Sequence, residues 1–80
     1  MNRPSGQQKR SVSLAGHATS IALEPEFWDM LEAMAAAEDR TLNQLIREID
    51  AGRGRRPLAS ACRLMALEFA QTGSRGRKSA

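Results

Sequence analysis

The chain has little of what most catalytic and metal-binding sites are built from. Among its 80 residues there is one histidine, one cysteine and no tyrosine. Nucleophilic catalysis needs a nucleophile with a nearby base, and zinc sites need several thiolate or imidazole ligands at short spacings. No glycine-rich phosphate loop follows a strand-like segment. We therefore expect no enzyme, no metal site and no cofactor.

Long apolar runs are also missing. The sequence has no stretch of 18 or more apolar residues, so we expect no membrane-spanning segment. Its first residues are polar, which predicts no secretory signal. Cys62 has no second cysteine with which to form an internal disulfide, as is typical of a reducing compartment. These features favour a cytoplasmic protein, associated with the nucleoid if it binds DNA.

The length and the ends of the sequence predict one small domain with two basic extensions. Eighty residues allow one domain that is marginally stable as a lone monomer. Residues 1–10 and 73–80 are polar and basic, with almost no apolar side chains, and read as disordered. The folded domain is therefore expected within residues 11–72.

The net charge of +3 is unevenly distributed along the chain. Residues 1–20 carry basic side chains and no acid, whereas most acids lie in residues 21–50. Arginine is concentrated again in residues 53–56. Basic segments around an acidic centre favour a polyanionic partner. The alternative is that these basic residues only keep a small protein in solution.

Residues 11–24 contain two alternating patterns of opposite phase. Val12 and Leu14 are apolar at even positions, whereas the later apolar residues occupy odd positions. Gly16 is the natural place for the phase to change, either in one bulged strand or between two short strands. If the odd residues face the core, the residues that face outward are Ala18, Ser20 and Ala22.

Three helices are expected after these alternating patterns. Pro25 suits the first position of a helix that reaches about Glu38. Thr41 and Gln44 fit a capping box that opens a second helix, which stops near Gly52. A third helix, from about Leu58 to Gln71, has a broad apolar face that either covers the core or binds another protein. Cys62 lies in this apolar stripe and is expected to be a core thiol.

The strand edge predicts a second copy of the chain. One short strand followed by helices leaves its backbone groups unpaired, and pairing with the same strand of another copy satisfies them. A two-stranded ribbon of this kind also fits the DNA major groove. The residues expected in the dimer core are Thr19, Ile21, Leu23, Phe27, Trp28, Leu31, Leu45, Ile46 and Ile49.

Residues 18–31 (ATSIALEPEFWDML) and 40–46 (RTLNQLI) together resemble the ribbon-helix-helix family. The resemblance covers roughly residues 17–50, and the segment after residue 57 is similar to a bacterial subgroup with an added C-terminal helix. It implies a mainly α fold with one short strand, in which two chains intertwine as a homodimer around a two-stranded antiparallel ribbon. A third, C-terminal helix completes the expected fold.

The resemblance also implies a function and a set of contacts. Members of the family are mostly transcriptional repressors that read the major groove with outward ribbon residues, here Ala18, Ser20 and Ala22. The amides that begin the second helix hold a phosphate. Together with basic side chains, the expected phosphate-binding residues are Lys9, Arg10, Arg40, Thr41, Leu42, Asn43, Arg53, Arg55 and Arg56.

Two functions remain open on the sequence. The first is a dimeric regulator that binds specific double-stranded DNA. The second is a protein-interaction module, such as an antitoxin or an adaptor, that uses the fold for dimerisation and captures a protein through residues 58–71. Alanine at two of the three outward positions limits base readout, which needs donors and acceptors, so affinity would then depend mainly on phosphate contacts.

Overall fold

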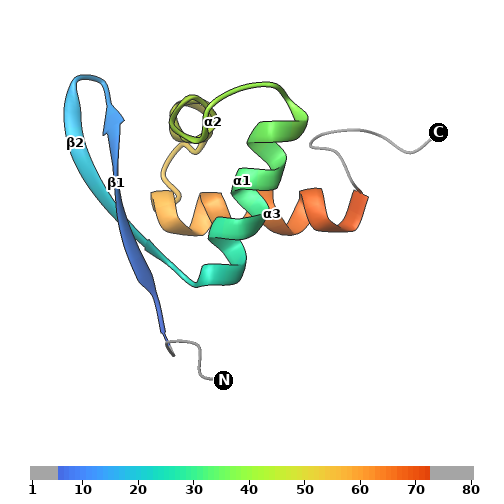
Figure 1. The fold of residues 1–80 in the computed structure, drawn as a ribbon. Coiled ribbons are helices and arrows are strands. Elements are labelled where there is room, and N and C mark those ends of the chain that lie inside the picture. The colour runs from blue at the N-terminus through green and yellow to red at the C-terminus, as the bar shows by residue number, and fades with distance from the viewer. Residues whose placement is uncertain (1–5, 73–80) are drawn as a thin grey trace.

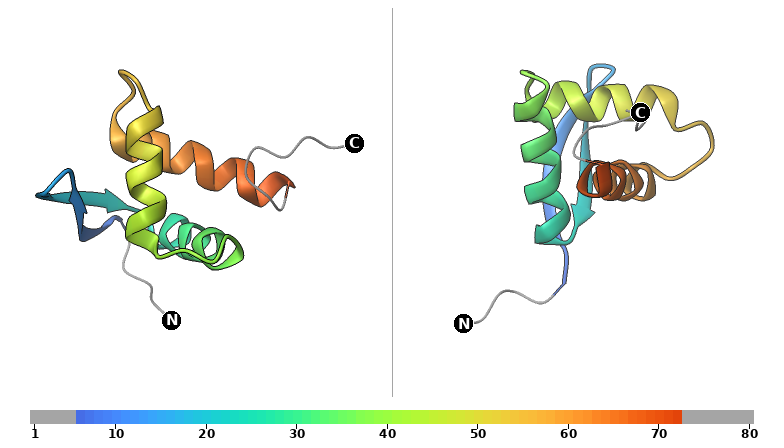
Figure 2. Two further views of the ribbon diagram at one scale, coloured as in Figure 1. Left: turned by 90° about the horizontal axis from the view of Figure 1, so that it is seen from above. Right: turned by 90° about the vertical axis from the view of Figure 1, so that its right-hand side faces the viewer.

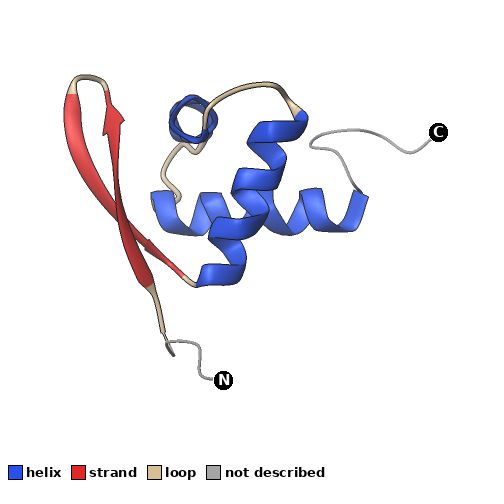
Figure 3. Cartoon of the chain, viewed as in Figure 1, coloured by secondary structure: helices blue, strands red, loops and turns tan. Residues whose placement is uncertain are grey.

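The computed structural model describes residues 6–72. Two strands come first and three helices follow, in the order β1, β2, α1, α2 and α3. The strands form a twisted, antiparallel, two-stranded ribbon on one side of the molecule, and the helices lie on the other side (Figure 1, Figure 3). This arrangement confirms the predicted ribbon-helix-helix architecture with a third C-terminal helix. The expected basic tail, residues 73–80, lies outside the described residues.

Both strands of the ribbon come from the same chain. β1 (Gln8–Leu14) and β2 (His17–Leu23) pair antiparallel, with Leu14 opposite His17. The expectation of one short strand is corrected to two, because a two-residue turn lets the chain pair with itself at little cost in loop closure. Residues 8–10, which were expected in the disordered arm, belong to β1.

The turn at Ala15 and Gly16 determines which residues share a face. Both have positive φ, 51° and 82°, as a type I′ turn requires. The expected change of phase therefore takes place by reversal of the chain, and not by a bulge. Even-numbered residues of β1 and odd-numbered residues of β2 lie on the same, inner face. The buried residues on this face are Val12, Leu14, Ile21 and Leu23.

α1 (Pro25–Ala37) begins with proline, which needs no backbone donor in the first helical turn. The Glu24 carboxylate makes no cap hydrogen bond and instead accepts hydrogen bonds from Arg63 at 2.9 and 3.2 Å. These bonds hold the pKa of Glu24 below its ordinary value and connect the start of α1 to α3. The helix ends one residue before the expected Glu38, and Asp39 then turns the chain with a φ of 58°.

α2 (Leu42–Gly52) begins at the expected capping box. Thr41 Oγ1 accepts a hydrogen bond from the Gln44 amide at 3.0 Å, and Gln44 Oε1 accepts one from the Thr41 amide at 2.8 Å. α3 (Leu58–Thr72) runs one residue further than expected. Between residues 6 and 72, no helix combines the length with the apolar character that a membrane crossing requires.

Figure 2 shows the ribbon and the three helices from two further directions. One hydrophobic core lies between the ribbon and the helices. Trp28 is fully buried at its centre, and its indole Nε1–H donates to the Gln8 carbonyl oxygen at 2.9 Å, so that burial leaves no donor unpaired. α3 contacts both other helices and β2. The helical residues buried in the core are Trp28, Leu31, Met34, Ala35, Leu45, Ile46, Ile49, Ala61, Cys62 and Ala66.

The residues that were expected to form a dimer core lie inside this one chain. Thr19 and Phe27 are half-buried, and the other members of that set are buried. β1 and α3 supply neighbours that the sequence analysis had assigned to a second copy. The structure is of a single chain, so the intertwined homodimer remains a prediction.

Replacing Ala15 with asparagine should stabilise the protein, because asparagine tolerates the left-handed backbone conformation better than alanine does. We expect the free energy of unfolding, measured by urea denaturation, to rise by about 1 kcal/mol. Gly16→Ala, which introduces a Cβ at a φ of 82°, is the opposing control and should lower it. If both variants unfold like the wild type, the two strands are not joined by this turn in solution.

Candidate nucleic-acid interface

The outer face of the ribbon carries no acidic side chain. Its cross-strand pairs are Lys9 with Ala22, Ser11 with Ser20, and Ser13 with Ala18. All of these residues are exposed except Ala22, which is half-buried. The structure therefore places the three predicted base-facing residues on the side of the ribbon away from the core.

Two of the six residues on this face were not predicted. Ser11 and Ser13 were given no role, and Lys9 was predicted as a phosphate ligand but placed in a disordered arm. The signal was present in the even phase of Val12 and Leu14, because their odd-numbered neighbours in a strand must point to the opposite face. The face thus holds three hydroxyl groups and one ammonium group. Its capacity for hydrogen bonding is greater than the alanine-rich set predicted.

The start of α2 is fixed beside the turn end of β1. The Asn43 side chain accepts a hydrogen bond from the Ser13 amide at 2.8 Å and donates one to the Ser13 carbonyl oxygen at 3.0 Å. The backbone amides of Leu42 and Asn43 have no acceptor in the described part of the chain, whereas the Thr41 amide is bonded to Gln44. Two of the three predicted phosphate-binding amides are therefore available at a helix N-terminus, where the dipole favours an anion.

Arg10, a predicted phosphate ligand, lies on the inner side of the ribbon. Its guanidinium carbon is 4.7 Å from the centroid of the Trp28 ring, and its Nη1 is 2.6 Å from the Glu32 carboxylate. Arg10 is an even-numbered residue of β1 and therefore points toward the helices. The structure assigns it to covering Trp28, and Lys9 is the basic residue of β1 that faces outward.

Arg40 is also held within the protein. Its guanidinium donates to the carboxylates of Glu48 and Glu38, the latter at 3.3 Å, and to the Gln44 carbonyl oxygen at 3.0 Å. The bond to Glu48 raises the pKa of Arg40 above its ordinary value. Arg40 lines a shallow hollow on the surface of α2 together with Arg47. Arg47 is exposed, and the sequence analysis did not name it as a candidate site residue. Nothing in the described residues pairs with its charge.

The basic loop lies at the other end of α2. This helix has 11 residues, which places the loop about 16 Å from the helix N-terminus. Arg53 bonds to the Asp50 carboxylate and to the Arg56 carbonyl oxygen, each at 2.7 Å. Arg55 and Arg56 are exposed, and no acid pairs with them within residues 6–72. The structure does not bring these arginines together with Thr41, Leu42 and Asn43.

Metal-binding and thiol groups are sparse in the described residues. No three side chains among the histidine, cysteine, aspartate and glutamate residues of positions 6–72 are placed to hold a metal ion. Cys62 is fully buried, and burial raises the pKa of its thiol to about 11. A thiol that is neutral and enclosed in this way is a packing group.

The ribbon, its outer face and the capped second helix have a counterpart among known proteins. The sequence model described as the ribbon-helix-helix domain matches residues 7–70. The chain belongs to this family. A solved structure, that of an uncharacterized protein from Bordetella pertussis Tohama I, superposes on this ribbon-helix-helix chain with a TM-score of 0.70 and is 33% identical in sequence. The match covers 81% of this chain and 56% of the Bordetella protein. No curated protein matches the chain.

Arg10→Ala should destabilise the ribbon-helix-helix domain, because it removes a cation–π contact, an exposed ion pair and the aliphatic stem that covers Trp28. We expect the free energy of unfolding in urea to fall by about 1 kcal/mol. Lys9→Ala, at the neighbouring position on the outer face, is the matched control and should change it by less than about 0.5 kcal/mol. Equal effects of the two substitutions would contradict the assignment of the faces.

Proposed function

We propose that this protein is a transcriptional regulator, most simply a bacterial cytoplasmic repressor, that reads the DNA major groove with the outer face of its ribbon. The observation that carries the proposal is a complete two-stranded ribbon whose outer side is free of acids and bears Lys9. A ribbon of this width fits the major groove, and an acid-free face does not repel phosphates.

The side chains of this face supply a modest direct readout. Hydroxyl groups of Ser11, Ser13 and Ser20 donate to base acceptors or accept from base amino groups. The methyl groups of Ala18 and Ala22 suit contact with the methyl group of thymine. Small side chains also let the ribbon approach the bases closely. Serine and alanine discriminate bases less strongly than a bidentate arginine or asparagine does, so DNA shape would contribute to the choice of site.

Contacts with the DNA backbone would position this readout. The free amides of Leu42 and Asn43 lie beside the turn end of the ribbon, because Asn43 is bonded to Ser13. A phosphate next to the groove can be held there while the ribbon contacts base edges. Arg47, with no ion pair in the described residues, adds a positive charge on the same helix.

We also propose that two copies act together on DNA. Family membership supports a homodimer, and the small outer face of one ribbon gives a reason for it, since two copies double the number of bases read. In this proposal the second copy contributes a second ribbon for DNA binding, and not a strand that completes the fold. Because β1 completes the ribbon and α3 covers the core, dimerisation would place two ribbons on one site and would not be needed to fold either chain.

Binding, and not catalysis, is the proposed activity. The buried Cys62 thiol, with its pKa raised to about 11, is unsuited to nucleophilic attack. A second candidate function, a protein-interaction module of the antitoxin or adaptor type, is favoured by one observation. Leu64 and Leu67 of α3 are 44% and 49% exposed, and because they lie three residues apart on the helix they form one exposed apolar patch.

Selection from randomised DNA duplexes at near-physiological salt should enrich a short sequence. Ser11→Ala and Ser20→Ala should relax the sequence preference, because each removes a hydrogen-bonding group from the ribbon face. Lys9→Ala should weaken binding to all sequences alike and lower the slope of log K against log salt by about one.

Ser60→Ala on α3 is the matched control and should bind DNA like the wild type. Recovery of DNA without enrichment, abolished by added salt, would mean that only phosphates are bound. Unchanged affinity and preference in all three ribbon variants would show that the ribbon is not the DNA surface.

The melting temperature should be independent of protein concentration over a roughly hundredfold range, because one chain forms both the ribbon and the core. Sedimentation of the complex with the selected site should nevertheless show two chains on each duplex. A melting temperature that rises with concentration would instead show that the fold requires the second chain, as an intertwined dimer does.

A further inference from the structure

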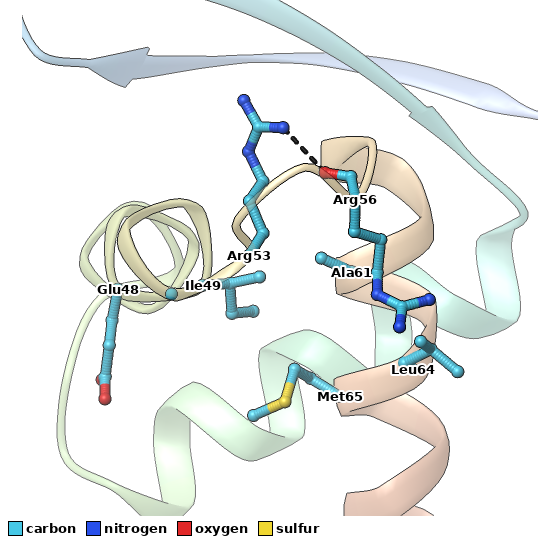
Figure 4. A pocket seen from close by; sticks show the side chains of 8 residues that line it. Glu48, Ile49, Arg53, Arg56, Ala61, Leu64 and Met65 are labelled. Carbon is cyan, nitrogen blue, oxygen red and sulfur yellow. Dashed lines mark hydrogen bonds between the residues drawn. The ribbon is translucent and has the colours of Figure 1, made fainter.

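A groove runs between α2 and α3, on the part of the surface that the ribbon does not form. Its volume is about 450 Å³, and Figure 4 shows the side chains that line it. Ile49 of α2 and Ala61, Leu64 and Met65 of α3 provide an apolar surface. The charged residues Glu48, Arg53 and Arg56 stand around it. A groove with an apolar floor and a charged rim is the form that helix-in-groove recognition uses.

The apolar surface of α3 continues beyond the groove. Leu64 is 44% exposed and Leu67 is 49% exposed, and among residues 6–72 these are the large hydrophobic side chains left open to solvent. Residues three apart on a helix are neighbours on one face. Leu64 and Leu67 therefore form one apolar strip at the mouth of the groove, and not two isolated exposed residues.

The charges at the loop end of the groove are positive, and that of Arg56 has no acid partner among the described residues. Arg53 is tied to the Asp50 carboxylate and to the Arg56 carbonyl oxygen, so the loop has a defined shape. The Arg56 side chain is directed toward Leu64 (Figure 4). Arg55, the preceding residue of the loop, is exposed, and neither arginine has an acid partner within the described residues. A ligand that fits this surface needs apolar side chains for the groove and carboxylates for these two arginines.

We propose that the groove binds an acidic amphipathic helix of another protein, through Leu64, Met65 and Leu67 on the apolar side and Arg56, with Arg55 next to it in the loop, on the charged side. Apolar residues spaced three or four apart on the partner helix would enter the groove. Its carboxylates at the loop end would pair with the two arginines, which favours acidic over basic partners. The proposal does not depend on DNA binding.

Charge decides against a second copy of this chain as the occupant. α3 carries one carboxylate, Glu68, so an α3 from another copy brings little negative charge to Arg55 and Arg56. α1 is acidic on its exposed side, at Glu26 and Glu32, but its large apolar side chains are buried or half-buried against its own core. Neither helix combines free apolar side chains with several acids.

The test uses the full chain and a displayed library of 16-residue peptides. Each peptide has a helical pattern of apolar positions, with glutamate or aspartate at the remaining positions near one end. A second library, with lysine in place of the acids, serves as the matched probe. We expect enrichment from the acidic library only. Enrichment from both libraries or from neither would overturn the proposal.

The site is then assigned with variants and fluorescence anisotropy of an enriched peptide. Arg56→Glu changes an exposed, unpaired side chain, and Leu64→Ala shortens a half-exposed one, so both should unfold like the wild type in urea. Each should weaken peptide binding roughly tenfold. Lys9→Ala on the ribbon should leave peptide binding unchanged, and Arg56→Glu should not alter the DNA sequence that is selected. Peptide binding that is indifferent to both groove variants would overturn the proposal.

Sedimentation of the free protein tests the remaining occupant. The wild type and Leu64→Ala are expected to show the same association state, because the proposed occupant of the strip is another protein and not a second copy of this chain. Loss of a wild-type dimer in Leu64→Ala would show that a second copy covers the strip and would overturn the proposal.

Discussion

The turn at Ala15 and Gly16 pairs Leu14 with His17, and this pairing determines which side of the protein is core and which is surface. A ribbon has two faces, and a slip of one residue would exchange them. With this register, apolar residues of opposite phase in the two strands lie together on the inner face. The serines and the lysine are thereby collected on the outer face. The same constraint thus produces the hydrophobic core and the candidate DNA surface.

Closure of the fold within one chain distinguishes the structure from the arrangement that the sequence suggested. The ribbon needs two strands, and the chain supplies both. The helical layer needs a cover for Trp28, Leu45 and Ile46, and α3 contributes to it, held to the start of α1 by the bond between Arg63 and Glu24. The ribbon and the helical core are thus both complete within one chain.

Local signals made much of the fold predictable from the sequence. Pro25, the capping box of Thr41 and Gln44, and the apolar spacing of each helix are decided by neighbours within a few residues. The two-stranded ribbon was harder to predict from the sequence, because a change of phase near Gly16 is compatible with either a bulge or a reversal of the chain. The reversal needs a positive φ at Ala15 as well as at Gly16, and alanine gives no sign of that conformation in the sequence.

The candidate site was predictable only in part. Outward Ser20 and the open amide of Leu42 follow from strand and helix periodicity. The separate fates of Lys9 and Arg10 were missed, because both residues were placed in a disordered arm and the alternation of Val12 and Leu14 was not extended back to them. Arg40 likewise resembles a free cation in the sequence, and only the loop geometry brings Glu38 and Glu48 to it.

The hydrogen bonds between Asn43 and Ser13 have a consequence for how the sheet can grow. The amide side chain occupies both backbone groups of Ser13, as a neighbouring strand would. The backbone N–H and C=O groups of Ser13 point away from β2. By the alternation of the antiparallel ladder, those of its partner Ala18 point away from β1. A strand that added to β1 near the turn would have to displace the asparagine, whereas β2 has no such substitute neighbour among the described residues. The two edges of the sheet are therefore not equivalent, and edge-to-edge pairing is opposed at the turn end of β1 by a single side chain.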